Sequence, residues 1–251
     1  MNRIPFKATL LLTVLLALAS PFTGFAQSLP LTIANADEAK AAGSALAREI
    51  LAQRPEENVT LIGALKIRAA NGVRREVPVR FETRVSPGDW QTIYETTAGS
   101  NRVTLTVVHR SEQPSQYQLN EGGTVRSLAG NETTNSFAGS DFWVADLGLE
   151  FFHWPEQRLI KKEIRRSRSC RVLESVNPQP DPNGYARVVS WIDRETLGIV
   201  HGEAFDANDK LLKEFDPKEF KKVNGQWQLQ EMEIRNVQTG SRTQIEFNLG
   251  Q

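Results

Sequence analysis

Much of this chain alternates apolar and polar residues with the period of two that is typical of half-buried β-strands. Two such runs, 59–69 and 74–85, flank Asn71-Gly72, and Asn-Gly tolerates the positive φ angles of a tight hairpin turn. In the second run every other position from Val77 onward is apolar or threonine, and the positions between them are mostly charged. We therefore predict a hairpin whose Val77 face is buried.

Similar runs, separated by short turn sequences, continue to the end of the chain. We predict further strands at 90–97, 102–110, 170–176, 185–192, 197–205, 211–220, 227–237 and 242–249, with a weak edge strand from Tyr117. Turns are expected at 86–89, 99–101, 193–196, 206–209 and 224–225. Because short connections make sequence neighbours spatial neighbours, the expected fold is α+β and mainly β: an incomplete antiparallel β-barrel of about eleven strands with a helical lid.

One helix is expected before the strands. Asn35 or Asp37 can cap it, Glu38 stands three residues after Asn35 as in a capping box, and Pro55 ends it. Its apolar and small residues form one narrow stripe, made of Ala39, Ala42, Gly43, Leu46 and Ile50. Small side chains on that stripe predict a close approach of the helix to the sheet.

A short segment in the middle of the chain is unusually aromatic. Between a possible cap at Asp141 and Pro155 it contains Phe142, Trp143, Leu147, Leu149, Phe151, Phe152 and Trp154. One interpretation is a core helix that packs on the sheet. The other is the lid or wall of a ligand cavity, because aromatic side chains supply a large apolar area at low rotamer cost. The two interpretations are compatible.

The first 26 residues have the features of a cleaved secretion signal. Arg3 and Lys7 precede an apolar run from Ala8 to Ala19, and small residues precede the expected cleavage after Ala26. We expect residues 27–251 to form a single exported domain, periplasmic in a Gram-negative cell, with no transmembrane segment. Its 28 basic and 30 acidic residues give a formal charge of −2, which argues against nucleic-acid binding.

Positive charge is concentrated in one stretch of the mature chain. Between Arg158 and Arg171 seven basic residues face one acidic residue, Glu163, and the centre of the stretch consists of Lys161, Lys162, Arg165, Arg166 and Arg168. Such a stretch can attract an anionic partner, either lipid headgroups or an acidic protein surface. Alternatively, it is a solvated strand edge that uses charge to discourage aggregation.

The sequence contains little that indicates catalysis. Cys170 is the only cysteine, and we interpret it as a small apolar strand residue, since nothing nearby marks His109, His153 or His201 as a partner for a catalytic thiol. His-Glu-x-x-His, Gly-x-Ser-x-Gly, Walker-type loops and metal-spaced Cys/His clusters do not occur. We therefore expect a protein that is not an enzyme and has no cofactor or metal.

Three stretches resemble a known family. These are Gly139-Ser140-Asp141-Phe142 with Asp146-Leu147, the strand 188–193 that contains Trp191, and the stretch 225–234 with its Trp and Met. They are similar to motifs of the LolA-like family of outer-membrane lipoprotein-sorting proteins, and the likeness extends from about Gly139 to Phe247.

The resemblance implies a half-open barrel, closed on its concave side by helices, whose apolar interior takes acyl chains of lipoproteins or other lipids. Relatives are often thought to serve membrane transporters, so an inner-membrane transporter is a possible partner of this chain, which we expect to be a monomer. This chain is more aromatic at residues 142–154 than the usual relative, and it lacks a lipid-anchor cysteine, so it matches the soluble carrier better than the anchored acceptor.

These observations define the expected ligand site. Its walls are predicted to be Phe142, Trp143, Leu147, Phe151, Phe152 and Trp154, and its floor Phe81 and Trp191. The alternative function is an envelope protein-interaction module that docks on a membrane transporter without lipid cargo.

Overall fold

The structure is a computed structural model that describes residues 31–32, 35–96, 102–110, 113–223 and 226–249. The predicted secretion signal and the predicted turns at 99–101 and 224–225 lie outside the described residues. Within the described part of the chain, no helix has both the length and the apolar character needed to cross a membrane.

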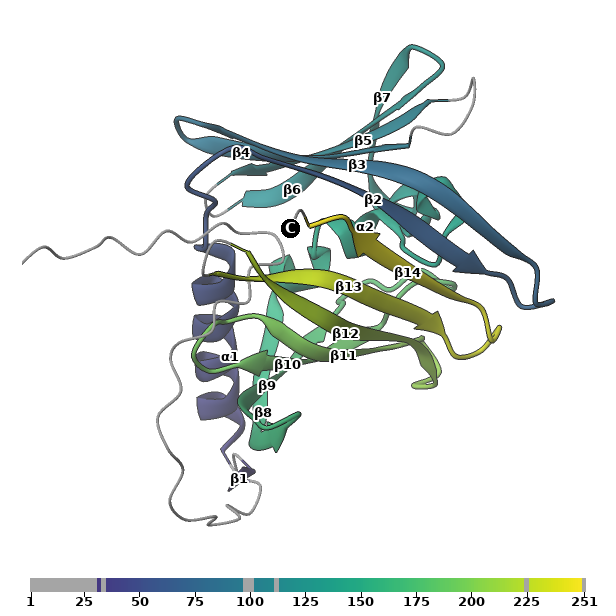
Figure 1. Ribbon diagram of the computed structural model, residues 1–251. Helices are drawn as coiled ribbons and strands as arrows, with labels where there is room; N and C mark the ends of the chain where they lie inside the picture. Colours follow the sequence, from purple (N-terminus) through teal and green to yellow (C-terminus); the bar gives the residue numbers. More distant parts are fainter. Residues whose placement is uncertain (1–30, 33–34, 97–101, 111–112, 224–225, 250–251) are drawn as a thin grey trace, which may run out of the picture.

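One strongly curved antiparallel sheet forms most of the molecule (Figure 1). Its strands are β1 (Leu31–Thr32), β2 (Val59–Arg68), β3 (Arg74–Ser86), β4 (Asp89–Thr96), β5 (Val103–Arg110), β6 (Gln113–Glu121), β7 (Thr124–Leu128), β8 (Glu156–Arg165), β9 (Arg168–Val176), β10 (Arg187–Asp193), β11 (Ile199–Phe205), β12 (Leu211–Val223), β13 (Gln226–Asn236) and β14 (Arg242–Phe247). The order across the sheet is β1-β8-β9-β10-β11-β12-β13-β14-β2-β3-β4-β5-β6-β7, so β1 and β7 are its two edges and the barrel is open.

The predicted architecture is therefore confirmed as an open, mainly β fold, but the described residues form fourteen strands and not about eleven. The additional strands are β1, β7 and β8. The sequence of β8 carries the basic stretch, whose charges obscure the alternation. The hairpin turn between β6 and β7 uses Gly122 and Gly123, both at positive φ.

The two halves of the sheet are joined by strands that are distant in sequence. β14 pairs with β2, and Ile245 is opposite Leu65 in this register. The backbones of β2 and β14 lie close together at Gly63, because a Cβ added there would lie 2.2 Å from the carbonyl oxygen of Glu246. This pairing brings the C-terminal meander against the first hairpin and creates one continuous concave face.

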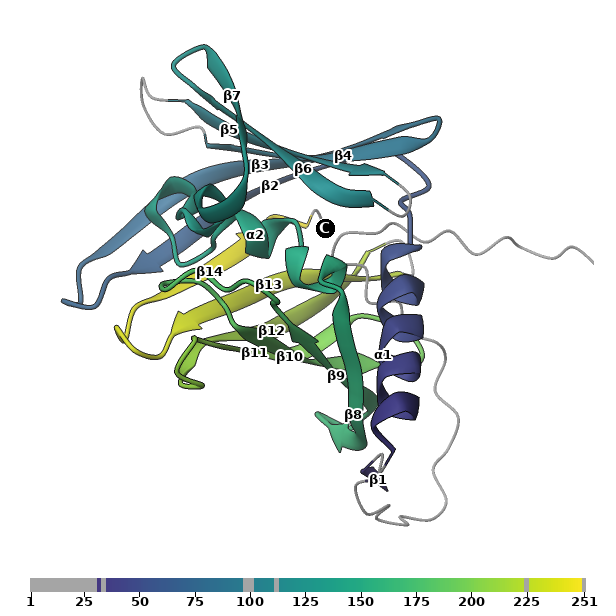
Figure 2. The ribbon, with the colours of Figure 1, turned by 180° about the vertical axis from the view of Figure 1, so that it is seen from behind.

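The helix α1 (Ala36–Leu51) runs alongside β8 and β9, as both views show (Figures 1 and 2). The Asn35 side chain caps it by accepting the backbone N–H groups of Asp37 and Glu38, which confirms the predicted start. At Gly43 an added Cβ would lie 2.5 Å from the backbone nitrogen of Arg158. The small-residue stripe therefore faces the sheet, as predicted.

The aromatic segment (residues 142–154) crosses the concave face, but it is not one helix. It contains α2 (Val144–Leu147) and the 3-10 turn η3 (Glu150–His153), and two earlier turns, η1 (Gly130–Thr134) and η2 (Phe137–Gly139), precede it. Leu149 lies between α2 and η3 with a left-handed backbone at φ 49°, which prevents a continuous helix. The segment therefore packs on the sheet, as one interpretation expected, but as α2 and η3 and not as one helix.

The two faces of the sheet bury very different amounts of apolar surface. The concave face carries the main core, which also includes the inner side of α1 and most of the aromatic segment. The convex face has a small cluster of Cys170, Val172, Val189 and Trp191 over the middle strands. Cys170 is 1% exposed, and burial raises the pKa of its thiol to about 11, which agrees with its interpretation as an apolar strand residue.

Candidate ligand-binding cavity

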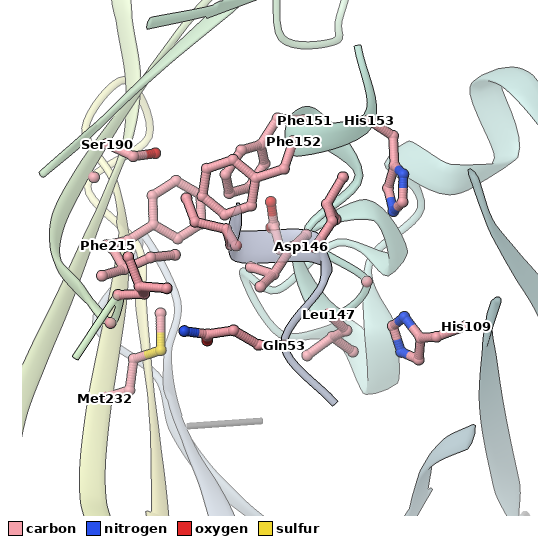
Figure 3. A pocket seen from close by; sticks show the side chains of 18 of the residues that line it. Gln53, His109, Asp146, Leu147, Phe151, Phe152, His153, Ser190, Phe215 and Met232 are labelled. Carbon is pink, nitrogen blue, oxygen red and sulfur yellow. The ribbon is translucent and has the colours of Figure 1, made fainter. Parts of the chain in front are cut away.

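A cavity of about 290 Å³ lies between the concave face, the C-terminal end of α1 and the aromatic segment (Figure 3). Its apolar lining comprises Ile50, Leu51, Phe81, Trp90, Tyr94, Phe142, Leu147, Leu149, Phe151, Phe152, Val188, Leu197, Ile199, Phe215, Leu229, Met232, Ile245 and Phe247. The polar side chains that reach it are Gln53, Arg54, His109, Arg110, Gln113, Asp146, His153 and Ser190. A mostly apolar lining with few polar groups is typical of small-molecule sites.

Five of the eight predicted ligand-site residues line this cavity, namely Phe81, Phe142, Leu147, Phe151 and Phe152. Phe81 contacts Tyr94 and Phe247 edge-on, with ring centroids 5.3 Å and 5.9 Å apart. Phe151 and Phe152 come from η3 and pack edge-on against each other, with ring centroids 4.5 Å apart (Figure 3). The aromatic walls therefore come from both the sheet and the segment that covers it.

The three predicted tryptophans lie elsewhere. Trp191 is on the convex face, where its indole N–H donates to Glu163 and the Arg165 guanidinium lies 4.3 Å from its ring centroid. Its prediction as a floor residue is wrong, because β10 directs Val188 and Ser190 into the cavity and the alternate residues Val189 and Trp191 to the other face. Trp143 and Trp154 pack on the core behind the cavity and do not line it.

Polar groups hold the aromatic segment to the sheet, and the first of them is the half-buried Asp141. Its carboxylate accepts the hydroxyls of Ser241, just before β14, at 2.5 Å and of Thr243 in β14 at 2.7 Å. Its backbone N–H also donates to Thr243 Oγ1 at 2.9 Å. The Asp in the Ser-Asp-Phe signature is thus an anchor between this segment and the last strand.

The second anchor is a buried ion pair between Lys213 of β12 and Asp146 of α2, with Nζ and Oδ2 3.2 Å apart. Asp146 also accepts the Tyr185 hydroxyl and the backbone N–H of Trp143. Lys213 donates to the carbonyl of Asp141 at 2.7 Å, and its Nζ lies 3.4 Å from the Trp143 ring centroid. Burial lowers the pKa of Lys213 to about 8 and raises that of Asp146, and each partner opposes the shift of the other.

Gln157 of β8 is the third anchor. Its side-chain amide donates to the carbonyls of Phe151 and Trp154, each at 2.9 Å, and its Oε1 accepts the Ser175 hydroxyl at 2.7 Å. Gln157 therefore satisfies carbonyls at the end of η3 that have no strand partner. The three anchors position Phe142, Phe151 and Phe152 at the cavity from strands at both ends of the meander.

Two histidines line one side of the cavity. The His109 ring stacks on Trp90 at 3.7 Å between centroids, and its Nδ1 lies 3.2 Å from the Ser115 hydroxyl. That hydroxyl, which belongs to β6, lies 3.5 Å from Nε2 of His153, so it bridges the imidazole of His109 in β5 and that of His153 in η3. Burial lowers the pKa of His109 to about 3, with a smaller contribution from His153, and also lowers the pKa of His153.

The basic stretch forms the hairpin of β8 and β9 and is largely balanced by acidic neighbours. Lys161 pairs with Glu163 at 2.8 Å, Arg166 with Asp216 at 3.0 Å, and Arg168 with Asp193 at 3.3 Å. Arg165 packs on Trp191, and Lys162 lies opposite Leu31 of β1. The ion pairs favour a structural role for these charges, and the anionic partner at this hairpin stays a prediction.

Several lining residues escaped the sequence analysis, although their strands were expected. Phe215 lies two residues after Lys213, and both point to the concave side of β12. A lysine two residues from a phenylalanine in a strand shares the face of that phenylalanine. This spacing was the pattern in the sequence that could have indicated a buried charge. Met232, Ile245 and Phe247 also occupy apolar positions in strands that alternate apolar and polar residues. Which face of each strand lines a cavity, however, depends on the curvature of the whole sheet.

Comparisons with known proteins agree with this fold. A family model described as "-like: Uncharacterized protein" matches residues 94–249, more than half of the chain. No curated protein matches the sequence.

Several solved structures are similar to this chain over most of their length. A DUF1329 family protein from Desulfovibrio piger has a TM-score of 0.68 at 18% identity and covers 85% of this chain and 95% of its own. A putative outer membrane lipoprotein-sorting protein domain from Vibrio parahaemolyticus has a TM-score of 0.69 at 18% identity, with 84% and 92% covered. A LolA superfamily protein from Nitrosomonas europaea has a TM-score of 0.57 at 12% identity, also with 84% and 92% covered. At these identities the likeness shows the fold.

Proposed function

Since this chain has a LolA-like fold, we propose that it is an exported periplasmic carrier that binds acyl chains of lipids or lipoproteins in its half-barrel cavity. The observation that carries the proposal is the apolar cavity on the concave face, with Phe81, Phe151, Phe152 and Phe215 in its walls. We propose that the protein is a binding protein and not an enzyme, and that it acts as a monomer together with a membrane transporter.

The energetics of apolar transfer are consistent with such a role. Moving an acyl chain of about 16 carbons from water into an apolar site releases on the order of 12 kcal/mol, at roughly 0.8 kcal/mol per methylene, before association costs. The same chain gains almost nothing when it leaves a bilayer, because the bilayer interior is equally apolar. A carrier of this kind therefore protects cargo in the aqueous compartment and depends on another component for extraction.

The test is uptake of a fluorescent fatty acid by the delipidated mature protein. The variant Met232→Trp fills the cavity from β13 and should abolish uptake, because Met232 lines the cavity and has room on the cavity side (Figure 3). The matched control is Glu231→Trp, which places the same side chain on the other face of the same strand. Uptake that persists in Met232→Trp, or is lost equally in both variants, would contradict the proposal.

Phe152→Asp is a second test, because Phe152 both lines the cavity and is only 2% exposed. If Phe152 serves mainly as a ligand wall, the substitution should weaken uptake far more than it lowers the melting temperature. Equal losses in uptake and thermal stability would identify Phe152 as ordinary core.

A further inference from the structure

The charged groups around the cavity differ between its interior and its mouth. Among the described lining residues, the acidic and basic side chains are Arg54, Arg110 and Asp146, together with His109 and His153, whose pKa values burial lowers. Asp146 is buried and neutralised by Lys213, whereas both arginines are exposed. Within the described residues, the exposed part of the lining therefore carries positive charge only.

The two arginines lie on neighbouring parts of the rim. The Arg54 guanidinium, just beyond α1, donates to the backbone carbonyls of Ser86 and Asp89 at the β3–β4 turn. Asp89 lies directly opposite Arg110 in the register of β4 and β5. Arg110 donates to the Gln116 side chain at 3.0 Å, and neither arginine has a carboxylate partner among the described residues. Both cations thus retain donors for a ligand at the mouth.

The size of the cavity restricts the ligand that can fill it. At about 290 Å³ it is at the lower end of the roughly 300–1,000 Å³ of small-molecule sites. That space suits one hydrocarbon chain and not the two chains of a diacyl lipid. The aromatic walls cannot widen easily, because Asp141, Lys213 and Gln157 anchor the segment that carries Phe142, Phe151 and Phe152.

We infer that the cargo is a single-chain anionic amphiphile, an inference that rests on the proposed function. Its hydrocarbon chain fills the phenylalanine-lined interior, and its head group binds Arg54 and Arg110 at the mouth of the cavity. A carboxylate and a phosphate share the required chemistry, because both accept charge-assisted hydrogen bonds from guanidinium groups. A free fatty acid and a lysophospholipid are the two sources of such a ligand.

The experiment is displacement of a fluorescent fatty acid from the mature protein by ligands of matched chain length. The series comprises dodecanoate, dodecyl phosphate, methyl dodecanoate, dodecylamine, an anionic lysophospholipid and its diacyl counterpart. We expect the single-chain anions to compete best. Added salt should weaken the binding of the anions and leave the binding of methyl dodecanoate unchanged. Better competition by dodecanoate indicates a fatty acid, and better competition by the lysophospholipid indicates a lipid head group.

Variants assign the effect to the mouth. Arg54→Gln and Arg110→Gln should each weaken anion binding by up to about fivefold, since exposed ion pairs contribute up to about 1 kcal/mol, and should leave methyl dodecanoate unchanged. Arg110→Glu should favour dodecylamine over dodecanoate. The matched control is Arg102→Gln, which removes an exposed arginine that does not line the cavity.

The outcomes separate this inference from the proposed function. If methyl dodecanoate or the diacyl lipid competes as well as dodecanoate, or if all arginine variants bind the anions normally, the inference is wrong while lipid binding stands. If no ligand of the series binds, the proposed function itself fails.

Discussion

At the scale of single residues, the buried ion pair of Lys213 and Asp146 is the most consequential feature. Lys213 is 1% exposed, yet it sits in a strand next to the cavity wall and holds α2 against β12. A buried ion pair contributes little net stability relative to an apolar pair. Removing one partner, however, strongly lowers the free energy of unfolding, because the other charge stays buried without its counter-ion. The pair therefore defines where the aromatic segment lies.

Lys213→Met should destabilise the protein by about 3–5 kcal/mol, because it leaves Asp146 buried without its cation. Adding Asp146→Asn to that variant should recover part of the loss. Urea unfolding measures both effects. The control Arg126→Gln breaks the exposed pair with Glu132 and should cost less than about 1 kcal/mol. A similar cost for Lys213→Met and Arg126→Gln would refute the role of the buried pair.

His109 gives the protein a defined acid sensitivity. Its folded-state pKa is about 3, compared with about 6.5 in the unfolded chain, so below pH 6.5 the unfolded state binds a proton that the folded state does not. The free energy of unfolding should therefore fall as pH decreases from 6.5 toward 3, by at most about 1.4 kcal/mol per pH unit from this residue.

Urea unfolding of the parent protein and of His109→Gln at a series of pH values measures this contribution. The variant should show a shallower decline in the free energy of unfolding below pH 6.5, whatever its stability at pH 7.5. Parallel curves for the two proteins would show that His109 is protonated as readily in the folded state as in the unfolded one.

At the scale of elements, the contact between α1 and β8 depends on Gly43. Alanine at this position would gain up to about 1 kcal/mol in helix propensity, but its Cβ would collide with the backbone of Arg158 and Gln157. Backbone atoms cannot move aside as a flexible side chain can. We expect Gly43→Ala to destabilise the protein by about 1–3 kcal/mol in thermal or urea unfolding.

Ser44→Ala is the matched control, because Ser44 lies next to Gly43 in α1 and already carries a Cβ, so that the substitution adds no atom toward the sheet. It should be neutral or slightly stabilising, through helix propensity. If Gly43→Ala were also stabilising, the helix could not lie as close to β8 as the structure places it.

At the scale of the whole molecule, ligand binding should be coupled to stability, because the cavity exists only when both halves of the sheet are assembled. A ligand at about 100 times its Kd should raise the free energy of unfolding by about 2.7 kcal/mol. Dodecanoate should therefore raise the melting temperature of the parent protein and of Glu231→Trp, but not that of Met232→Trp. Equal shifts in all three would place the ligand outside the cavity.

The sequence by itself determined the local structure of this protein. Period-two alternation, Asn-Gly turns and the Asn35 cap depend on neighbouring residues, and they predicted α1, most strands and the apolar face that contains Phe81. The density of aromatic residues in the segment 142–154 also identified four side chains of the cavity, namely Phe142, Leu147, Phe151 and Phe152. Trp191 was misplaced because alternation defines two faces without stating which one is concave.

Only the tertiary structure decided how these elements enclose a cavity. The pairing of β14 with β2 and the contact of Lys213 with Asp146 join residues far apart in sequence, and no local pattern specifies such partners. The same holds for the mouth, where the end of α1 brings Arg54 to the strands that carry Asp89 and Arg110. The physical reason is that burial, the position of a cavity and the balance of charge around it depend on the curvature of the complete sheet.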